Sequence, residues 1–154
     1  MYIYRATRND IFYLLDMWKR LSDYHMRFED YMEPSQNWRE VLISLYNDDF
    51  DRADRLILIA KDKGKYIGFV RVEIKTISSI FQRKVTGYIS DIYIDEEYRG
   101  SGLAESFMKE VRNWLKSKRI YDVRLNVNSQ NIRAINFYKK MGFDEVNKTF
   151  KLNI

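Results

Sequence analysis

The stretch 91–107, DIYIDEEYRGSGLAESF, constrains the fold of this chain more than any other segment. It opens with alternating apolar residues typical of a strand and continues into apolar residues spaced four apart, which predict a helix over about 103–117. Gly100 and Gly102 lie at the junction, where glycine can adopt backbone conformations closed to other residues. The unpaired N–H groups at a helix N-terminus face an anion favourably, so the junction is either a phosphate-binding site or an ordinary turn.

Length and composition favour one domain covering 1–154. The chain has 154 residues, of which 45% are hydrophobic, and a single proline, and no linker or repeat interrupts it. It contains no cysteine and only one histidine, His25, which argues against thiolate chemistry, histidine triads and a metal site. No run of 18 apolar residues and no secretory signal is present, so we expect a cytoplasmic protein with no membrane partner.

The charge balance is basic but dispersed. Lys and Arg number 27 against 22 Asp and Glu, giving a formal charge of +5, which suits a phosphate-bearing ligand. The densest basic run is only KSKR at 116–119, and no nucleic-acid-binding motif is present. These features argue against nucleic acid as a partner.

The rest of the chain predicts a mixed α/β (α+β) fold. Apolar periodicity indicates helices over 10–25, 34–47 and 129–141, and strand patterns occur at 2–7, 55–74 (a hairpin around KDKGK), 85–95, 121–128 and 144–153, the last as a strand pair. The order is β-α-α-β-β-β-α-β-α-β-β. Such an order suggests a central sheet covered by helices.

The spacing of the glycines excludes two common phosphate-binding motifs. A P-loop needs a lysine after its last glycine, where Leu103 stands, and a dinucleotide-binding loop needs a glycine where Glu105 stands. The pattern Arg99-x-x-Gly102-x-Ala104 instead resembles the Gln/Arg-x-x-Gly-x-Gly/Ala motif of the GNAT N-acetyltransferase superfamily. The later stretch NSQNIRAINFYKKMGF (128–143) resembles the second signature of that superfamily.

The resemblance, specific from about 88 to 143, implies a fold and a function. The fold is a mixed, mostly antiparallel sheet of about seven strands flanked by about four helices. The function is transfer of the acetyl group of acetyl-CoA to a primary amine, such as a small amine, a polyamine or a protein amine, by direct attack in a ternary complex. Homodimers are frequent among similar proteins.

The resemblance also implies the residues that bind CoA. The strand DIYI parts from its neighbour and exposes backbone groups to the pantetheine arm, and the glycine turn holds the pyrophosphate with its amides. Asn131 either caps its helix, contacts CoA, or does both. The implied CoA-binding residues are Ile92, Tyr93, Ile94, Arg99, Gly100, Ser101, Gly102, Leu103, Ala104, Glu105 and Asn131.

Catalysis needs a neutral amine, an oxyanion donor and a proton for the leaving thiolate. An alkylamine of pKa near 10.4 is neutral in only about one molecule in 2,500 at pH 7, so a base is useful. Tyr138 occupies the superfamily's tyrosine position and is the candidate acid, and the Ile92 N–H is the implied oxyanion donor. Asp91 is either the base or a carboxylate that attracts a cationic substrate, and a water chain is the alternative base, because Asn126 stands where some relatives carry a glutamate.

The acceptor pocket is implied to form around 21–38, which is aromatic and acidic. Its members are Tyr24, His25, Phe28, Tyr31, Trp38, Glu29, Asp30 and Glu33, a composition that suits a cationic amine. For Trp38 a core position, and for His25 a surface position, is the competing interpretation. A non-catalytic CoA-binding or interaction module is the alternative function, because no base is unambiguous. A nucleotide-binding protein is a weaker third.

Overall fold

The computed structural model describes residues 1–154, and its strands form one open sheet in chain order. The strands are β1 (Tyr2–Arg5), β2 (Arg55–Asp62), β3 (Lys65–Thr76), β4 (Val85–Ile94) and β5 (Val123–Arg124). Neighbouring strands are antiparallel except β4 and β5, which are parallel. The predicted hairpin is formed by β2 and β3.

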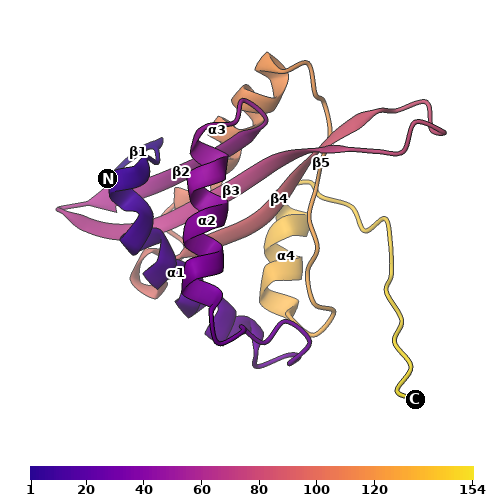
Figure 1. The fold of residues 1–154 in the computed structure, drawn as a ribbon, viewed down its shortest axis with the longest axis horizontal. Coiled ribbons are helices and arrows are strands. Elements are labelled where there is room, and N and C mark those ends of the chain that lie inside the picture. Colours follow the sequence, from indigo (N-terminus) through magenta and orange to yellow (C-terminus); the bar gives the residue numbers. More distant parts are fainter.

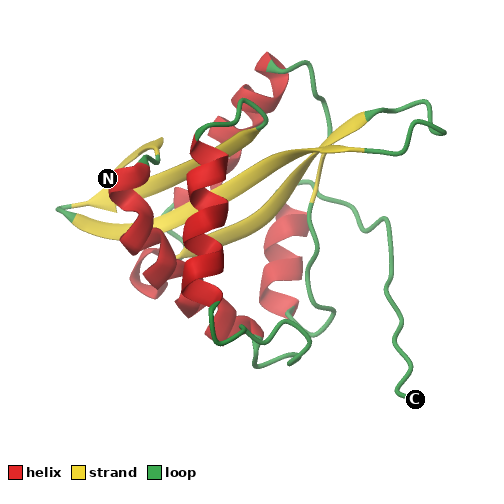
Figure 2. Cartoon of the chain, viewed as in Figure 1, coloured by secondary structure: helices red, strands yellow, loops and turns green.

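Helices cover both faces of this sheet (Figures 1 and 2). They are α1 (Ile11–His25), α2 (Trp38–Phe50), α3 (Leu103–Ser117) and α4 (Ile132–Lys140), and single 3-10 turns lie at Arg8–Asp10 and Glu96–Tyr98. Figure 1 shows α1 and α2 in front of the sheet and α3 behind it. None of these helices has the length and apolar character that crossing a bilayer requires.

The second helix begins later than its sequence predicts. Pro34 lies in the preceding loop, and α2 starts only at Trp38. The Trp38 ring stacks on Trp18 of α1 at 5.4 Å between centroids, so the helix starts where its side chains can first pack on α1.

The hydrophobic core has one layer on each side of the sheet. Strand β2 serves both layers, because Leu56 and Leu58 belong to the cluster under α3 whereas Ile57 and Ile59 belong to the cluster under α1 and α2. This is why its LILIA run is continuously apolar rather than alternating. Helices therefore pack on both faces of the sheet, and this packing holds β4 in its place between β3 and β5.

The predicted number of strands is wrong in detail. The sheet has five strands instead of about seven, because the strand pair expected at 144–153 does not form. That segment, DEVNKTFKLNI, forms no backbone hydrogen bonds, so its alternating pattern finds no partner strand within the chain. The order β-α-α-β-β-β-α-β-α up to α4 is confirmed.

Phe107 is the central side chain of the α3 layer and is fully buried, at 0% exposure. Replacement by alanine leaves a cavity, so we expect Phe107→Ala to lower the free energy of unfolding by about 3–5 kcal/mol. Phe12 on α1 is 70% exposed, and Phe12→Ala should change this free energy by less than about 0.5 kcal/mol. Urea unfolding followed by circular dichroism measures both, and equal losses would contradict this core assignment.

Candidate active site

The open edge of β4 is the first element of the site. Strands β4 and β5 pair only at Gly87 with Val123 and at Tyr88 with Arg124. Beyond these pairs, the β5-facing edge of β4 has no partner strand. The backbone groups along this part of β4, which includes Ile92 to Ile94, can therefore accept an extended ligand.

A β-bulge accompanies this opening. Arg71 of β3 lies opposite Asp91, and Val72 lies opposite Ile89, so Ser90 is an extra residue in β4. A bulge increases the local twist and re-aims the neighbouring side chains. It lies directly before the candidate base.

The glycine turn supplies the second element. Gly100 has a φ of 77° and Gly102, the N-cap of α3, has a φ of 86°, a region that favours glycine. A Cβ built on either glycine would meet nothing within 4 Å, so the surface above the turn is open. The amides from Gly102 to Glu105 have no hydrogen-bond acceptor within the protein. They are free to bind an anion at the positive end of the helix dipole.

The acidic residues just before this turn are paired with cations. They therefore present no unpaired negative charge that would repel an anion. Lys65 lies 3.4 Å from a carboxylate oxygen of Asp95 and 2.8 Å from one of Glu97. Arg99 lies 3.4 Å from Glu96 and donates to the carbonyl of Ile94 at 3.3 Å. Each of the three carboxylates therefore has a cationic neighbour.

Asn131 connects the N-terminus of α4 with α1. Its side-chain oxygen accepts from the Ala134 N–H at 3.3 Å, which confirms its role as a helix cap. The same oxygen accepts from the Tyr24 hydroxyl of α1, also at 3.3 Å. The Arg99 guanidinium lies over the Tyr24 ring at 5.9 Å, so α1, the glycine turn and α4 meet here.

Tyr138 lies on α4 between the rings of Phe137 and Phe143, at 5.4 and 5.6 Å between centroids. Its hydroxyl makes no hydrogen bond within the protein. Burial among these side chains raises the pKa of Tyr138 to about 12. The phenol consequently keeps its proton throughout the neutral range and can donate it.

Asp91 ends a chain of polar contacts that runs from the buried pair of Arg71 and Asp49 out to the exposed Ser90. The Ser90 hydroxyl donates to Asp91 at 2.8 Å and accepts from the Arg71 guanidinium at 3.0 Å. Arg71 in turn donates two bonds to Asp49 of α2, at 2.6 and 2.9 Å. Desolvation is the largest cause that raises the pKa of Asp91, while the Ser90 hydrogen bond and the Arg71 charge oppose it.

Sequence reasoning missed Ser90, Arg71 and Asp49. A usable signal was the arginine within FVRVEI (69–74), since a charged residue inside an apolar strand must have a partner when it is buried. The partner itself, on α2, could not be found from spacing because it lies 22 residues away in the chain.

One open cleft of about 2570 Å³ brings most of the predicted residues together. Its lining includes Asp91, Ile92, Tyr93, Ile94, Arg99, Gly100, Gly102, Ala104, Glu105, Asn131 and Tyr138. Two predicted residues do not line it: Leu103 is buried in the core, and Ser101 is exposed with its hydroxyl bonded to the Tyr98 carbonyl at 2.6 Å. Their backbone amides remain part of the turn.

The predicted acceptor segment contributes to the same cleft only in part. Tyr24, His25, Phe28, Glu29 and Tyr31 line it. Asp30, Glu33 and Trp38 do not, and Trp38 packs half-buried against the core of the α1 and α2 layer. His25 is exposed, as its competing interpretation predicted. Among the carboxylates that line the cleft, Asp91 is linked through Ser90 to the buried pair of Arg71 and Asp49.

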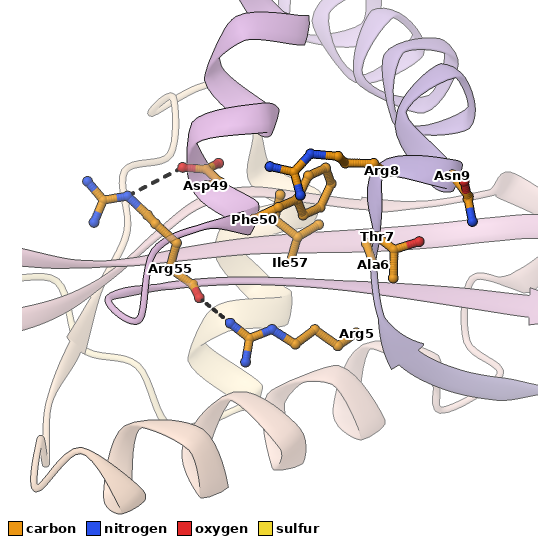
Figure 3. Close-up of a pocket in the computed structure, with 9 residues that line it drawn as sticks. All are labelled: Arg5, Ala6, Thr7, Arg8, Asn9, Asp49, Phe50, Arg55 and Ile57. Carbon is orange, nitrogen blue, oxygen red and sulfur yellow. Dashed lines mark hydrogen bonds and ion pairs between the residues drawn. The ribbon is translucent and has the colours of Figure 1, made fainter.

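A second, smaller pocket of about 420 Å³ lies at the junction of β1, α2 and β2 (Figure 3). Its lining residues are Arg5, Ala6, Thr7, Arg8, Asn9, Asp49, Phe50, Arg55 and Ile57. Arg55 lies 3.5 Å from Asp49, Arg5 donates to the Arg55 carbonyl at 3.0 Å, and Arg8 pairs with Asp51 at 2.6 Å. Arg8 and Arg55 are therefore paired with carboxylates, whereas Arg5 is hydrogen-bonded to a carbonyl alone.

Neither pocket contains a metal-binding arrangement, since no group of three or more His, Asp or Glu side chains is positioned to hold an ion. The open strand edge, the free amides and the tyrosine are all groups that act without a metal.

Comparison with known proteins places the chain in a family. Residues 16–143 match the model of the acetyltransferase (GNAT) family. An uncharacterized N-acetyltransferase of Methanocaldococcus jannaschii is 33% identical over 87 residues, which are 56% of this chain and 38% of that protein. A thialysine N-epsilon-acetyltransferase of Bos taurus is 36% identical over 59 residues, 38% of this chain and 35% of that protein. The matches thus span between about a third and two fifths of these relatives' lengths.

Solved structures share the fold. A tetramutant of the BH1408 protein from Bacillus halodurans has a TM-score of 0.86 at 22% identity, covering 100% of both chains. A predicted acetyltransferase of Clostridium acetobutylicum, solved with acetyl-CoA, has a TM-score of 0.78 at 21% identity, covering 99% of this chain and 95% of that one. The family-model match over residues 16–143 shows that the chain belongs to the acetyltransferase (GNAT) family, and the open strand edge and the glycine turn agree with it.

Proposed function

We propose that this protein transfers the acetyl group of acetyl-CoA to a primary amine. The observation that carries the proposal is the set of free amides from Gly102 to Glu105, which opens onto the same cleft as the unpaired edge of β4. The pyrophosphate of CoA binds these amides, and its pantetheine arm adds to β4 along Ile92, Tyr93 and Ile94. Asn131 contacts the arm from the opposite wall.

The acceptor is an amine that arrives as a cation. The cleft presents the aromatic faces of Tyr24, Phe28 and Tyr31 and the carboxylate of Asp91, groups that favour a positive charge. Relatives carry names such as thialysine N-epsilon-acetyltransferase and streptothricin acetyltransferase, which are named for amine-bearing acceptors. A small amine, a polyamine or a lysine side chain fits this chemistry.

The reaction proceeds by direct attack of the neutral amine on the thioester carbonyl. Asp91 takes the amine proton, directly or through water, and its raised pKa makes it a better base than an exposed aspartate. The Ile92 N–H stabilises the developing oxyanion. As the carbon–sulfur bond breaks, Tyr138 donates its proton to the departing thiolate, which leaves free CoA and the acetylated amine.

Binding of acetyl-CoA is the first test. Ala104 lines the cleft at the second position of α3, so Ala104→Asp places a negative charge against the pyrophosphate while suiting the helix N-terminus. We expect its Kd for acetyl-CoA to rise at least about tenfold, or about 1.4 kcal/mol. Asn113→Asp adds the same charge on the exposed side of α3 and should leave the Kd unchanged. Calorimetry that detects no acetyl-CoA binding by the wild-type chain would refute the proposal.

Turnover distinguishes an enzyme from a CoA-binding module. Free thiol release is followed with acetyl-CoA and a panel of polyamines, amino acids, aminoglycosides and lysine peptides. We expect Tyr138→Phe to lower kcat by about 10² to 10⁴-fold with an unchanged Kd for acetyl-CoA. The matched control is Tyr121→Phe, because Tyr121 is 80% exposed, and it should turn over normally. A wild-type kcat in Tyr138→Phe would remove the acid role, and binding without turnover across the panel would favour the module.

The two roles of Asp91 predict different kinetics. If Asp91 is the base, Asp91→Asn lowers kcat by about 10² to 10⁴-fold. If it only attracts the cationic acceptor, the variant raises KM for that acceptor and spares kcat. We expect the first result, and steady-state kinetics with the best amine of the panel measure it.

The pH profile tests the Ser90 contact. The hydrogen bond from Ser90 favours the charged carboxylate and so lowers the pKa of Asp91 against the larger effect of burial. Ser90→Ala removes it, and the acidic limb of the kcat profile should move to higher pH, whereas Ser90→Thr should restore it. An unmoved limb in Ser90→Ala would show that this hydroxyl does not act on the titrating group.

A further inference from the structure

Tyr46 of α2 is a fully buried polar group to which the proposed reaction gives no role. Its side chain is 0% exposed, and its hydroxyl is the one buried side-chain polar atom that forms no hydrogen bond within the protein. A phenylalanine would fill nearly the same space without burying a hydroxyl, and a buried phenol usually has a partner. The hydroxyl therefore needs an acceptor that is not a protein group in direct contact.

The buried face of α2 places Tyr46 beside the ion pair of Asp49 and Arg71. Tyr46 lies three residues before Asp49, and residues with this spacing are neighbours on one face of a helix. Asp49 accepts two hydrogen bonds from Arg71 of β3, at 2.6 and 2.9 Å. Arg71 lies opposite Asp91 in the register of β3 with β4. Helix α2 thus carries the Tyr46 side chain onto the part of the sheet that holds Asp91.

The packing around Tyr46 agrees with this placement. Tyr46 belongs to the same buried cluster as Phe69 of β3 and Tyr93 of β4, which lie opposite each other in the sheet. Two positions along each strand, on the same face, the next opposed pair is Arg71 and Asp91. Tyr46 therefore lies where the apolar layer under α2 meets this polar pair.

Asp91 is the charged group that acts most strongly on Tyr46. Burial is the largest cause that raises the pKa of Tyr46 well above its usual value, and the charge of Asp91 is the next, ahead of Arg71 and Asp49. The Asp91 carboxylate accepts a hydrogen bond from Ser90 at one oxygen, and its other oxygen has no partner within the protein. Asp91 also lines the cleft, so water can reach it. A buried water commonly joins such a donor and acceptor when they are too far apart to bond directly.

We propose that Tyr46 is a positioning residue for Asp91: its hydroxyl donates a hydrogen bond to a buried water, and that water donates one to the free carboxylate oxygen. The inference rests on the proposed acetyl transfer, in which Asp91 takes the amine proton. Ser90 then binds one oxygen and the water the other, so the carboxylate keeps one orientation toward the acceptor amine. Both hydrogen bonds favour the charged carboxylate and oppose the effect of burial.

Other titratable and charged groups around Asp91 bear on its titration. They come from α1, α2, β3 and β4, and are His25, Asp49, Arg71, Glu73 and Tyr88. Arg71 and His25 lower the pKa of Asp91, whereas Glu73 raises it. Tyr46→Phe leaves all of these groups in place and removes a neutral hydrogen-bond donor. A change in the titration of Asp91 in this variant therefore reports the hydroxyl.

Carboxyl titration tests the contact without any turnover. The side-chain carboxyl carbons of aspartate are labelled with ¹³C, the Asp91 signal is assigned with Asp91→Asn, and its chemical shift is followed against pH without acetyl-CoA. In Tyr46→Phe we expect the proton affinity of Asp91 to rise about threefold to tenfold, the effect of losing one hydrogen bond, so that its titration moves to higher pH. Tyr66→Phe removes a hydroxyl that is bonded to Asp10 at 3.1 Å and should leave this titration unchanged. An unmoved titration in Tyr46→Phe, or one moved to lower pH, overturns the proposal.

Crystallography tests the water itself. A high-resolution crystal structure should contain a water within hydrogen-bond distance of both the Tyr46 hydroxyl and the Asp91 carboxylate, and the structure of Tyr46→Phe should lack it. A Tyr46 hydroxyl bonded to another group instead overturns the proposal.

Turnover separates this inference from the proposed function. The acidic limb of the kcat profile of Tyr46→Phe should move by the same amount as the Asp91 titration, with an unchanged Kd for acetyl-CoA. A moved titration with an unmoved limb would support the contact between Tyr46 and Asp91 and would remove Asp91 from the role of base.

Discussion

The parting of β4 from β5 is the constraint on which the rest of the site depends. The two strands pair through Gly87 and Tyr88 only, and the bulge at Ser90 twists β4 where pairing stops. Continued pairing would fill the edge of β4 with hydrogen bonds and close the cleft. The same separation leaves β5 short, because only Val123 and Arg124 pair with β4.

The buried ion pair between Arg71 and Asp49 fixes this geometry from the side of α2. It joins α2 to the sheet. Removing either partner would leave the other charge buried and unpaired, which lowers the free energy of unfolding by about 3–5 kcal/mol. Through Ser90 the guanidinium also reaches Asp91, so packing of α2 on the sheet and the ionisation of the candidate base are linked. Asp49 also lines the small pocket, so the contacts from Asp49 through Arg71 and Ser90 to Asp91 connect this pocket with the cleft.

The sequence was sufficient for the local elements and for the ligand turn. The turn is predicted by Gly100 and Gly102, and the helix after it by the spacing of its apolar residues. Both signals come from residues close together in the chain, so they can be found without knowing the tertiary structure. Ser90 and Arg71 could not be predicted as site residues. The position of Ser90 depends on the register of β3 with β4, and the role of Arg71 depends on its partner Asp49 on α2. The last strands were mispredicted for a related reason: the alternation in 144–154 is real, but pattern alone does not say which edge a strand pairs with.

The contact between Tyr24 and Asn131 bears on how the protein is made. It joins residues 107 positions apart, so it forms only after a loop of nearly that length has closed. A nascent chain can complete the sheet from β1 to β4 and the helices on it while α4 is still inside the ribosome. The wall of the cleft that α4 supplies therefore takes its place after the sheet from β1 to β4 has formed.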